Sequence, residues 1–79
     1  MFTIKHIDRN NTQHLISTDS VWYTDNSEEV AGTNKPVVRA VHYSTNETVE
    51  GVRVAKVLTF GTVYVMNYNG KTIADYHLD

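Results

Sequence analysis

Apolar and polar residues alternate along this chain in short runs, and no long segment repeats an apolar residue every three or four positions. Valine, isoleucine, threonine and aromatic residues dominate the runs, and these residues suit the half-buried surface of a β-sheet. The pattern predicts strands at 2–8, 13–17, 37–44, 49–58, 63–68 and 71–78, with a further extended piece at 20–24. Because the connections are short, neighbouring strands should be antiparallel. We predict one all-β domain over residues 1–79, a sheet of five or six strands that curls into a small barrel or packs as a minimal sandwich.

The pair Asn69-Gly70 separates the last two runs and is the strongest hairpin signal in the sequence. A two-residue type I′ turn needs positive φ at both central positions, and Asn-Gly favours this conformation. Such a loop places Met66 opposite Ile73. It thereby fixes the pairing of all residues of the two strands that lie farther from the turn. Since side chains alternate between the faces of a strand, one face of this hairpin should form core. That face carries Val63, Val65, Ala74, Tyr76 and Leu78.

The opposite face of the hairpin mixes apolar and polar side chains. Aromatic and methionine residues are enriched at the centres of protein interfaces, so this face is a candidate binding surface. Two interpretations remain open, because the face could instead pack within the protein, under a loop at 25–36. The single tryptophan, Trp22, similarly indicates either a core anchor or a binding hot spot. The candidate partner-binding residues are Tyr64, Met66, Tyr68, Lys71, Ile73, Asp75 and Trp22.

The other connections carry weaker signals. Residues 27–31 predict one helical turn, with Asp25 or Ser27 as its N-cap and Gly32 as its stop. A turn is expected at 45–48, followed by a bulge at Gly51.

A turn is expected at 9–12 between the first two strands, and one form of it is a two-residue loop at Asn10-Asn11. This loop pairs His6 with Leu15, so that His6 and His14 should point to opposite faces.

The composition narrows the classes of partner. The chain has no cysteine, no signal-peptide pattern and no apolar stretch of membrane-spanning length, so we expect a cytoplasmic protein without a membrane anchor. The seven basic residues are scattered, which argues against a nucleic-acid partner. Four acids follow one another with no base between them, and they indicate either a solvated loop or a surface that docks on a basic partner. These acids are Asp19, Asp25, Glu28 and Glu29.

No residue pattern in the chain indicates catalysis. The four histidines lack the spacing of metal ligands, no serine lies in a nucleophile motif, and the four glycines are dispersed. We therefore expect no catalytic residue, no metal and no cofactor. One alternative rests on Arg39 and Arg53, which lie on adjacent predicted strands. Between protomers of a homo-oligomer they could hold the phosphates of a sequestered signal nucleotide.

The C-terminal run 61–78, together with the opening strand, its Asn-rich turn and the segment 19–23, resembles small accessory proteins of tailed bacteriophages. The resemblance implies a host-takeover or counter-defence role inside a bacterial cell. Proteins of this kind, such as anti-CRISPR and anti-restriction proteins, bind one bacterial protein complex and block it. We expect a non-enzymatic inhibitor that acts by stoichiometric occlusion. The alternatives are the ligand-sequestering module and a structural or self-assembling protein.

Overall fold

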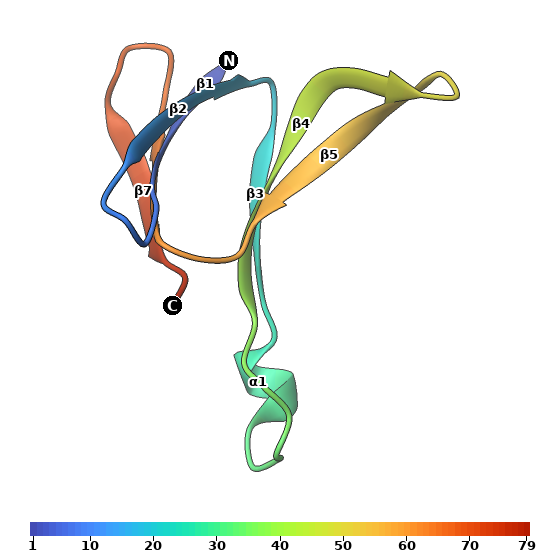
Figure 1. Ribbon diagram of the computed structural model, residues 1–79, viewed down its shortest axis with the longest axis vertical. Coiled ribbons are helices and arrows are strands. Elements are labelled where there is room, and N and C mark those ends of the chain that lie inside the picture. Colours follow the sequence, from blue (N-terminus) through green and yellow to red (C-terminus); the bar gives the residue numbers. More distant parts are fainter.

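The computed structural model describes all 79 residues and contains two antiparallel sheets (Figure 1). The four-stranded sheet has the order β2-β1-β6-β7 and is built from β1 (Phe2–Ile7), β2 (Gln13–Thr18), β6 (Thr62–Met66) and β7 (Thr72–His77). The three-stranded sheet has the order β3-β4-β5 and is built from β3 (Val21–Asp25), β4 (Arg39–Val49) and β5 (Val52–Leu58). The all-β class is thus confirmed. The sheets do not close into a barrel, and there are seven strands because the extended piece at 20–24 is a full strand.

A small core lies between the two sheets. Its buried cluster consists of Ile4, Val41, Tyr43, Val63, Val65 and Leu78. Tyr23 of β3 stacks on Tyr76 of β7 with 4.3 Å between the ring centroids, and this pair joins the sheets. The predicted core face of the last hairpin is confirmed, since three of its five residues belong to the cluster and Ala74 and Tyr76 pack against it.

The chain passes from one sheet to the other at the corner between β2 and β3. Thr18 is buried there, and its hydroxyl lies 2.8 Å from the carbonyl of Ser44 and 2.9 Å from that of Ser20. The Ser44 amide donates to the Ser20 carbonyl at 3.1 Å. These bonds fix the corner to the middle of β4.

Two of the three hairpins use the same turn, and it is one residue longer than the sequence predicted. In the β6–β7 turn, Gly70 has φ +80° while Asn69 has negative φ, so this is no type I′ turn. Gly70 donates to the Asn67 carbonyl, and Asn67 donates to the Lys71 carbonyl. This is the pattern of a type I turn followed by a left-handed residue.

The longer turn moves the register of the adjacent residues. Met66 pairs with Thr72 and not with Ile73, and a bulge at Ile73 then restores the predicted pairing of Val65 with Ala74. Between β1 and β2 the left-handed residue is Asn11, with φ 64°, and no bulge follows. His6 therefore pairs with His14, and the prediction that the two histidines point to opposite faces is wrong.

The third hairpin contradicts the prediction of a turn at 45–48. Strand β4 continues to Val49, and the turn is the pair Glu50-Gly51, in which both residues have positive φ. Gly51 therefore lies in the turn and is not a bulge. The bulge occurs on β4, where residues 45–47 lie opposite the single residue Val54. The β4–β5 hairpin projects beyond the rest of the molecule (Figure 1).

The segment between β3 and β4 forms a second projection. Helix α1 (Ser27–Val30) confirms the predicted helical turn, but its N-cap is Asn26, and the caps expected at Asp25 or Ser27 are wrong. The Asn26 side chain instead closes the loop, because its Oδ1 accepts the Val38 amide at 2.7 Å. The structure contains no helix with the length and apolar character needed to cross a membrane.

The C-terminus closes the connection between β5 and β6. Asp79 accepts the Gly61 amide at 2.8 Å, and its other carboxylate oxygen accepts Arg9 at 3.0 Å. The Arg9 guanidinium lies over the Phe60 ring at 4.9 Å. The Gly61 amide bond, followed by the Arg9 contact, holds the pKa of the Asp79 carboxyl below its ordinary value.

Candidate binding surfaces

The outer face of the four-stranded sheet carries most of the predicted partner-binding residues. One row of cross-strand neighbours runs from Leu15 through Lys5 and Tyr64 to Asp75. The Lys5 ammonium lies 5.8 Å from the centroid of the Tyr64 ring. We call this surface the hairpin face and define it by Lys5, Leu15, Tyr64, Met66, Ile73 and Asp75 of the strands and by Tyr68 at the turn. Lys71 faces Asn67 across the longer turn, so alternation from Met66 places Lys71 on the other side.

The hairpin face is open to solvent. Tyr64 and Met66 are half-buried among their sheet neighbours, Ile73 is exposed, and Tyr68 at the turn is 83% exposed. The segment 25–36 does not cover this face, because it projects from the end of β3 and β4 (Figure 1). The interpretation that this face packs beneath that loop is therefore wrong.

Trp22 lies on a different surface. Its indole stacks on the His42 ring, with centroids 5.3 Å apart and planes 4° apart, and His42 Nε2 lies 2.9 Å from the Thr24 hydroxyl. The adjacent residue Tyr23 faces the core, so Trp22 points to the outer side of the three-stranded sheet. With 45% of its surface exposed, Trp22 is not a core anchor. The structure does not bring it together with the hairpin face.

The four predicted acids do not form one patch. Asp19 lies at the corner before β3 and Asp25 at the end of β3, a separation of about 20 Å along an extended chain. Asp19 pairs with Arg53 at 2.8 Å. Glu28 and Glu29 are exposed and take part in no ion pair, so of these four acids only the two on α1 are unpaired.

Asp25 is held by several groups at the base of α1. Its carboxylate accepts the Ser27 amide at 2.8 Å and the Tyr23 hydroxyl at 3.0 Å, and it pairs with Arg39 at 3.3 Å. The bonds from Ser27, above all, hold the pKa of Asp25 below its ordinary value. Its role in the structure is to anchor the projecting loop.

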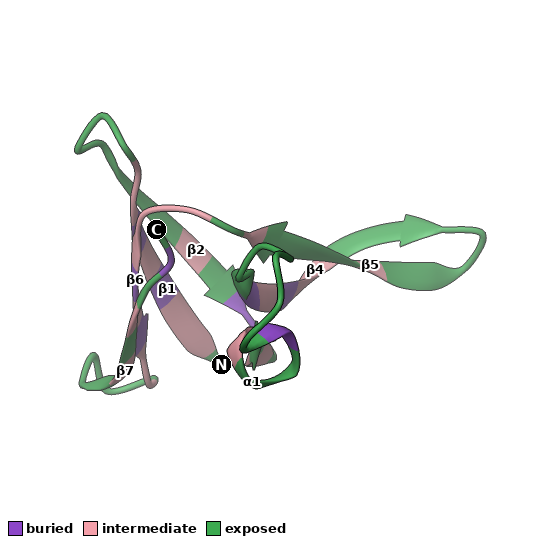
Figure 2. Cartoon of the chain, turned by 90° about the horizontal axis from the view of Figure 1, so that it is seen from below, coloured by how far each residue is buried: buried purple, intermediate pink, exposed green.

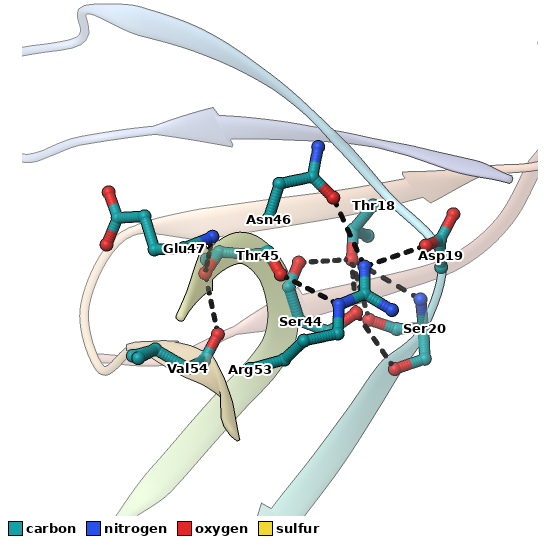
Figure 3. A network of polar contacts seen from close by, with 9 residues as sticks. All are labelled: Thr18, Asp19, Ser20, Ser44, Thr45, Asn46, Glu47, Arg53 and Val54. Carbon is teal, nitrogen blue, oxygen red and sulfur yellow. Dashed lines mark hydrogen bonds and ion pairs between the residues drawn. The ribbon is translucent and has the colours of Figure 1, made fainter. Parts of the chain in front are cut away.

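Arg39 and Arg53 are not close to each other. They lie near opposite ends of the β4–β5 pair, and the shorter route along the paired strands spans seven residues, about 23 Å at the rise of a strand. Arg53 is engaged, since its guanidinium donates to the Thr45 carbonyl, to Asp19 and to Asn46 (Figure 3). One chain therefore offers no site at which both arginines could hold a phosphate.

The one cavity of the structure lies beside Arg53. It is lined by Met1, Ser17, Thr18, Asp19, Ser44, Asn46 and Arg53 and measures about 90 Å³. Pockets for small organic ligands usually measure several hundred Å³, about 300 at the least, so this cavity is too small for a nucleotide.

The histidines form contacts with their sheet neighbours. The His6 ring is buried, its Nε2 lies 3.0 Å from the Phe60 carbonyl, and its centroid is 5.8 Å from that of His14. His14 lies 2.9 Å from Asp8, and this hydrogen bond is the main reason why the pKa of Asp8 is lowered. No three His, Asp or Glu side chains are placed so that they could share a metal ion.

The structure adds Lys5 of β1 and Leu15 of β2 to the hairpin face. No signal in the sequence marked either residue, because their positions follow only from the pairing of β1 with β2 and β6. Comparison with known proteins adds no assignment, because the chain matches no family model, no curated protein and no solved structure.

Proposed function

We propose that this protein is a non-enzymatic binding protein that occludes the surface of a bacterial protein complex through its hairpin face. The observation that carries the proposal is the combination of an open sheet face with aromatic and aliphatic side chains along it. Tyr68 projects from one end of that face almost fully exposed. Exposed apolar groups that are clustered and rimmed by charges are typical of interaction sites.

The hairpin face is suited to binding because its strands already hold its shape. Lys5 and Tyr64 lie on β1 and β6, which are paired with each other and with β2 and β7. The backbone of the face is therefore ordered before binding. A preorganised surface loses less conformational entropy on association than a flexible one, so more of the contact energy appears as affinity.

The free acids on α1 support a basic partner. Glu28 and Glu29 stand on a projection without ion-pair partners, and such charges raise association rates with a surface of opposite charge. The resemblance of the C-terminal hairpin to phage accessory proteins supports a more specific form of the proposal. In that form the target is a bacterial defence or host complex, and binding blocks its active surface.

The test begins with recovery of the partner. The tagged full chain is incubated with bacterial lysate, washed at high salt, and the retained proteins are identified by mass spectrometry. One dominant complex in stoichiometric amount is the expected result. Recovery of the chain alone would contradict the proposal.

Variants then test the hairpin face against that partner. Tyr68→Ala removes an exposed aromatic ring and should weaken affinity by about 2 kcal/mol, or roughly 30-fold, if Tyr68 is an interface hot spot. Trp22→Ala is the matched control, because it removes an exposed aromatic ring from the other sheet and should leave affinity unchanged. Equal affinity of Tyr68→Ala and the wild type would refute the assignment of the hairpin face.

The acidic projection needs a separate measurement. Reversing the charges of Glu28 and Glu29 to lysine should slow association with a basic partner and reduce its dependence on salt, with a smaller effect on dissociation. Stopped-flow association at two ionic strengths measures this. An unchanged association rate would remove α1 from the proposed binding surface.

A further inference from the structure

The β4–β5 hairpin has an apolar side that nothing in the chain covers. Leu58 and Tyr43 contact the core at one end of the three-stranded sheet, and residues 45–56 continue the hairpin beyond it as an arm. Figure 2 shows that the outer part of the arm, residues 46–53, is exposed, whereas the buried residues lie where the sheets meet; within the arm only residues 45 and 54 are half-buried. The arm therefore contributes little to the core of its own chain.

Alternation along β5 places valines on the side of the arm that is continuous with the core. Starting from Leu58, which packs on the core, every second residue of β5 points to the same side, so this side carries Lys56, the half-buried Val54 and the exposed Val52. Val49 pairs with Val52 across the turn. We call Val49, Val52 and Val54 the valine strip. Val49 is 63% and Val52 is 68% exposed, although both are β-branched apolar residues.

The total surface of the molecule is larger than a chain of this size usually exposes. The accessible area is 5590 Å² for 9.0 kDa, whereas compact monomers of this mass expose about 4,900 Å². The radius of gyration is 13.9 Å, against about 11.6 Å for a compact domain of this length. The excess, about 700 Å², is shared by the two projections, so the arm contributes part of the roughly 800 Å² that each partner buries in an interface of standard size.

The charges on the arm favour a second copy over a strongly charged partner. Lys56 pairs with Glu47 at 3.4 Å, and Arg53 pairs with Asp19 at 2.8 Å. Only Glu50, at the turn, lacks an ion-pair partner among the charged residues of the arm. The apolar strip is thus flanked by charges that are already neutralised, so two copies can approach without strong like-charge repulsion.

We propose that the valine strip is the contact of a two-fold symmetric dimer, in which the arms of two copies of this chain pack against each other. A two-fold contact uses the same patch on both partners, as a self-complementary valine surface requires. This contact lies on the three-stranded sheet, away from the hairpin face. The dimer would therefore present two hairpin faces, and its existence does not depend on the proposed function.

Sedimentation equilibrium of the full chain, from low micromolar to near-millimolar concentration, tests the proposal. The wild type should rise from the monomer mass towards twice that mass. Val52→Glu introduces a charge into the valine strip and should weaken dimerisation about tenfold or more, because a buried unpaired charge is costly. Val57→Glu is the matched control, since Val57 lies on the same strand, is 50% exposed and points to the other side. It should dimerise like the wild type.

Three outcomes would overturn the dimer proposal. They are a wild type that stays monomeric at the highest concentration, a Val52→Glu variant that dimerises like the wild type, and a Val57→Glu variant that is weakened equally. Far-UV circular dichroism checks that each variant folds. If Val52→Glu does not fold, Val52→Thr replaces one methyl with a hydroxyl of similar shape and should weaken dimerisation to a smaller extent. Tyr68→Ala should leave the dimer intact, which separates this test from that of the partner-binding face.

Discussion

Replacing Gly61 with alanine should destabilise the protein far more than the same change at Gly70. Both glycines have left-handed backbones, with φ +81° and +80°. A Cβ on Gly70 would meet no atom within 4 Å, whereas a Cβ on Gly61 would lie 2.3 Å from the Ile7 carbonyl oxygen. The two substitutions share the cost of the left-handed conformation and differ in the steric conflict, so their difference measures the close approach of two backbone segments.

The magnitude follows from what must move. A left-handed alanine costs about 1–2 kcal/mol, and the lower flexibility of the unfolded alanine chain offsets about 0.4–1 kcal/mol of this, so Gly70→Ala should cost about 1 kcal/mol. At Gly61 the Ile7 carbonyl has to shift, although Ile7 is the last residue of β1 that pairs with β6. The same shift disturbs the Asp79 bond to the Gly61 amide. Losing two hydrogen bonds adds about 2 kcal/mol, for a total of about 3 kcal/mol.

Chemical and thermal unfolding measure the difference. A domain of this length has a total stability of about 4–12 kcal/mol, so Gly61→Ala should remove a large part of it. The melting temperature should fall by about 12–24 °C, compared with about 4–8 °C for Gly70→Ala. Equal losses in the two variants would refute the reasoning, because they would mean that the β5–β6 connection does not approach the end of β1.

Three further predictions concern polar groups. Thr18→Val keeps the shape of the side chain but removes the buried hydroxyl that bonds the Ser44 carbonyl, whereas the Ser20 carbonyl keeps the Ser44 amide as a donor; the variant should lower the free energy of unfolding in urea by about 1–3 kcal/mol, while Ser17→Ala on the exposed side should change little. The pKa of Asp79 is depressed in the folded state, so its stabilisation is present above its unfolded pKa and is lost as the pH falls through the folded value. Thermal unfolding between neutral pH and pH 3 should therefore show a smaller acid loss in Asp79→Asn than in the wild type, and parallel curves would contradict this. Burial, followed by the bond to Asp25, raises the pKa of Tyr23, so Tyr23→Phe should remove a late-ionising component from the alkaline absorbance titration, and an unchanged titration would contradict the contact.

The sequence predicts the strands well but not the turns that join them. Alternation predicts the last two strands at 63–68 and 71–78, within two residues of β6 and β7, and it identifies their core face. The turn lengths were missed because Asp8 and Asn67 each accept backbone amides from residues two and four positions later. These bonds stabilise a type I turn with one left-handed residue at Asn11 or Gly70. Asn-Gly alone does not distinguish this turn from a two-residue loop, since both accept glycine at the last position.

The sequence predicts which side chains share a candidate surface only where the pattern within a single strand determines which way they point. The side of Tyr64 follows from its buried neighbours Val63 and Val65 within β6. Trp22 stands beside Tyr23, and both residues suit a core, so the sequence does not show which of the two faces inward. The answer depends on the packing of Tyr23 against Tyr76 of β7, a contact between residues far apart in the chain. The separation of Asp19 from the acids of α1 likewise requires the path of β3 in space.

The small core connects the fold to the proposals about its surfaces. Only ten of 79 residues are buried, and one aromatic stack joins the two sheets at the edge of the core. A fold with so little buried area is only marginally stable. Its two projections enlarge the surface and add little to the core. A partner that binds only the folded state raises the free energy of unfolding. The increase grows with the logarithm of the ratio of the free partner concentration to the dissociation constant. Covering the valine strip or the hairpin face would therefore supply apolar burial that the single chain lacks. In the proposed complexes, association would be a direct source of stability as well as a means of recognition.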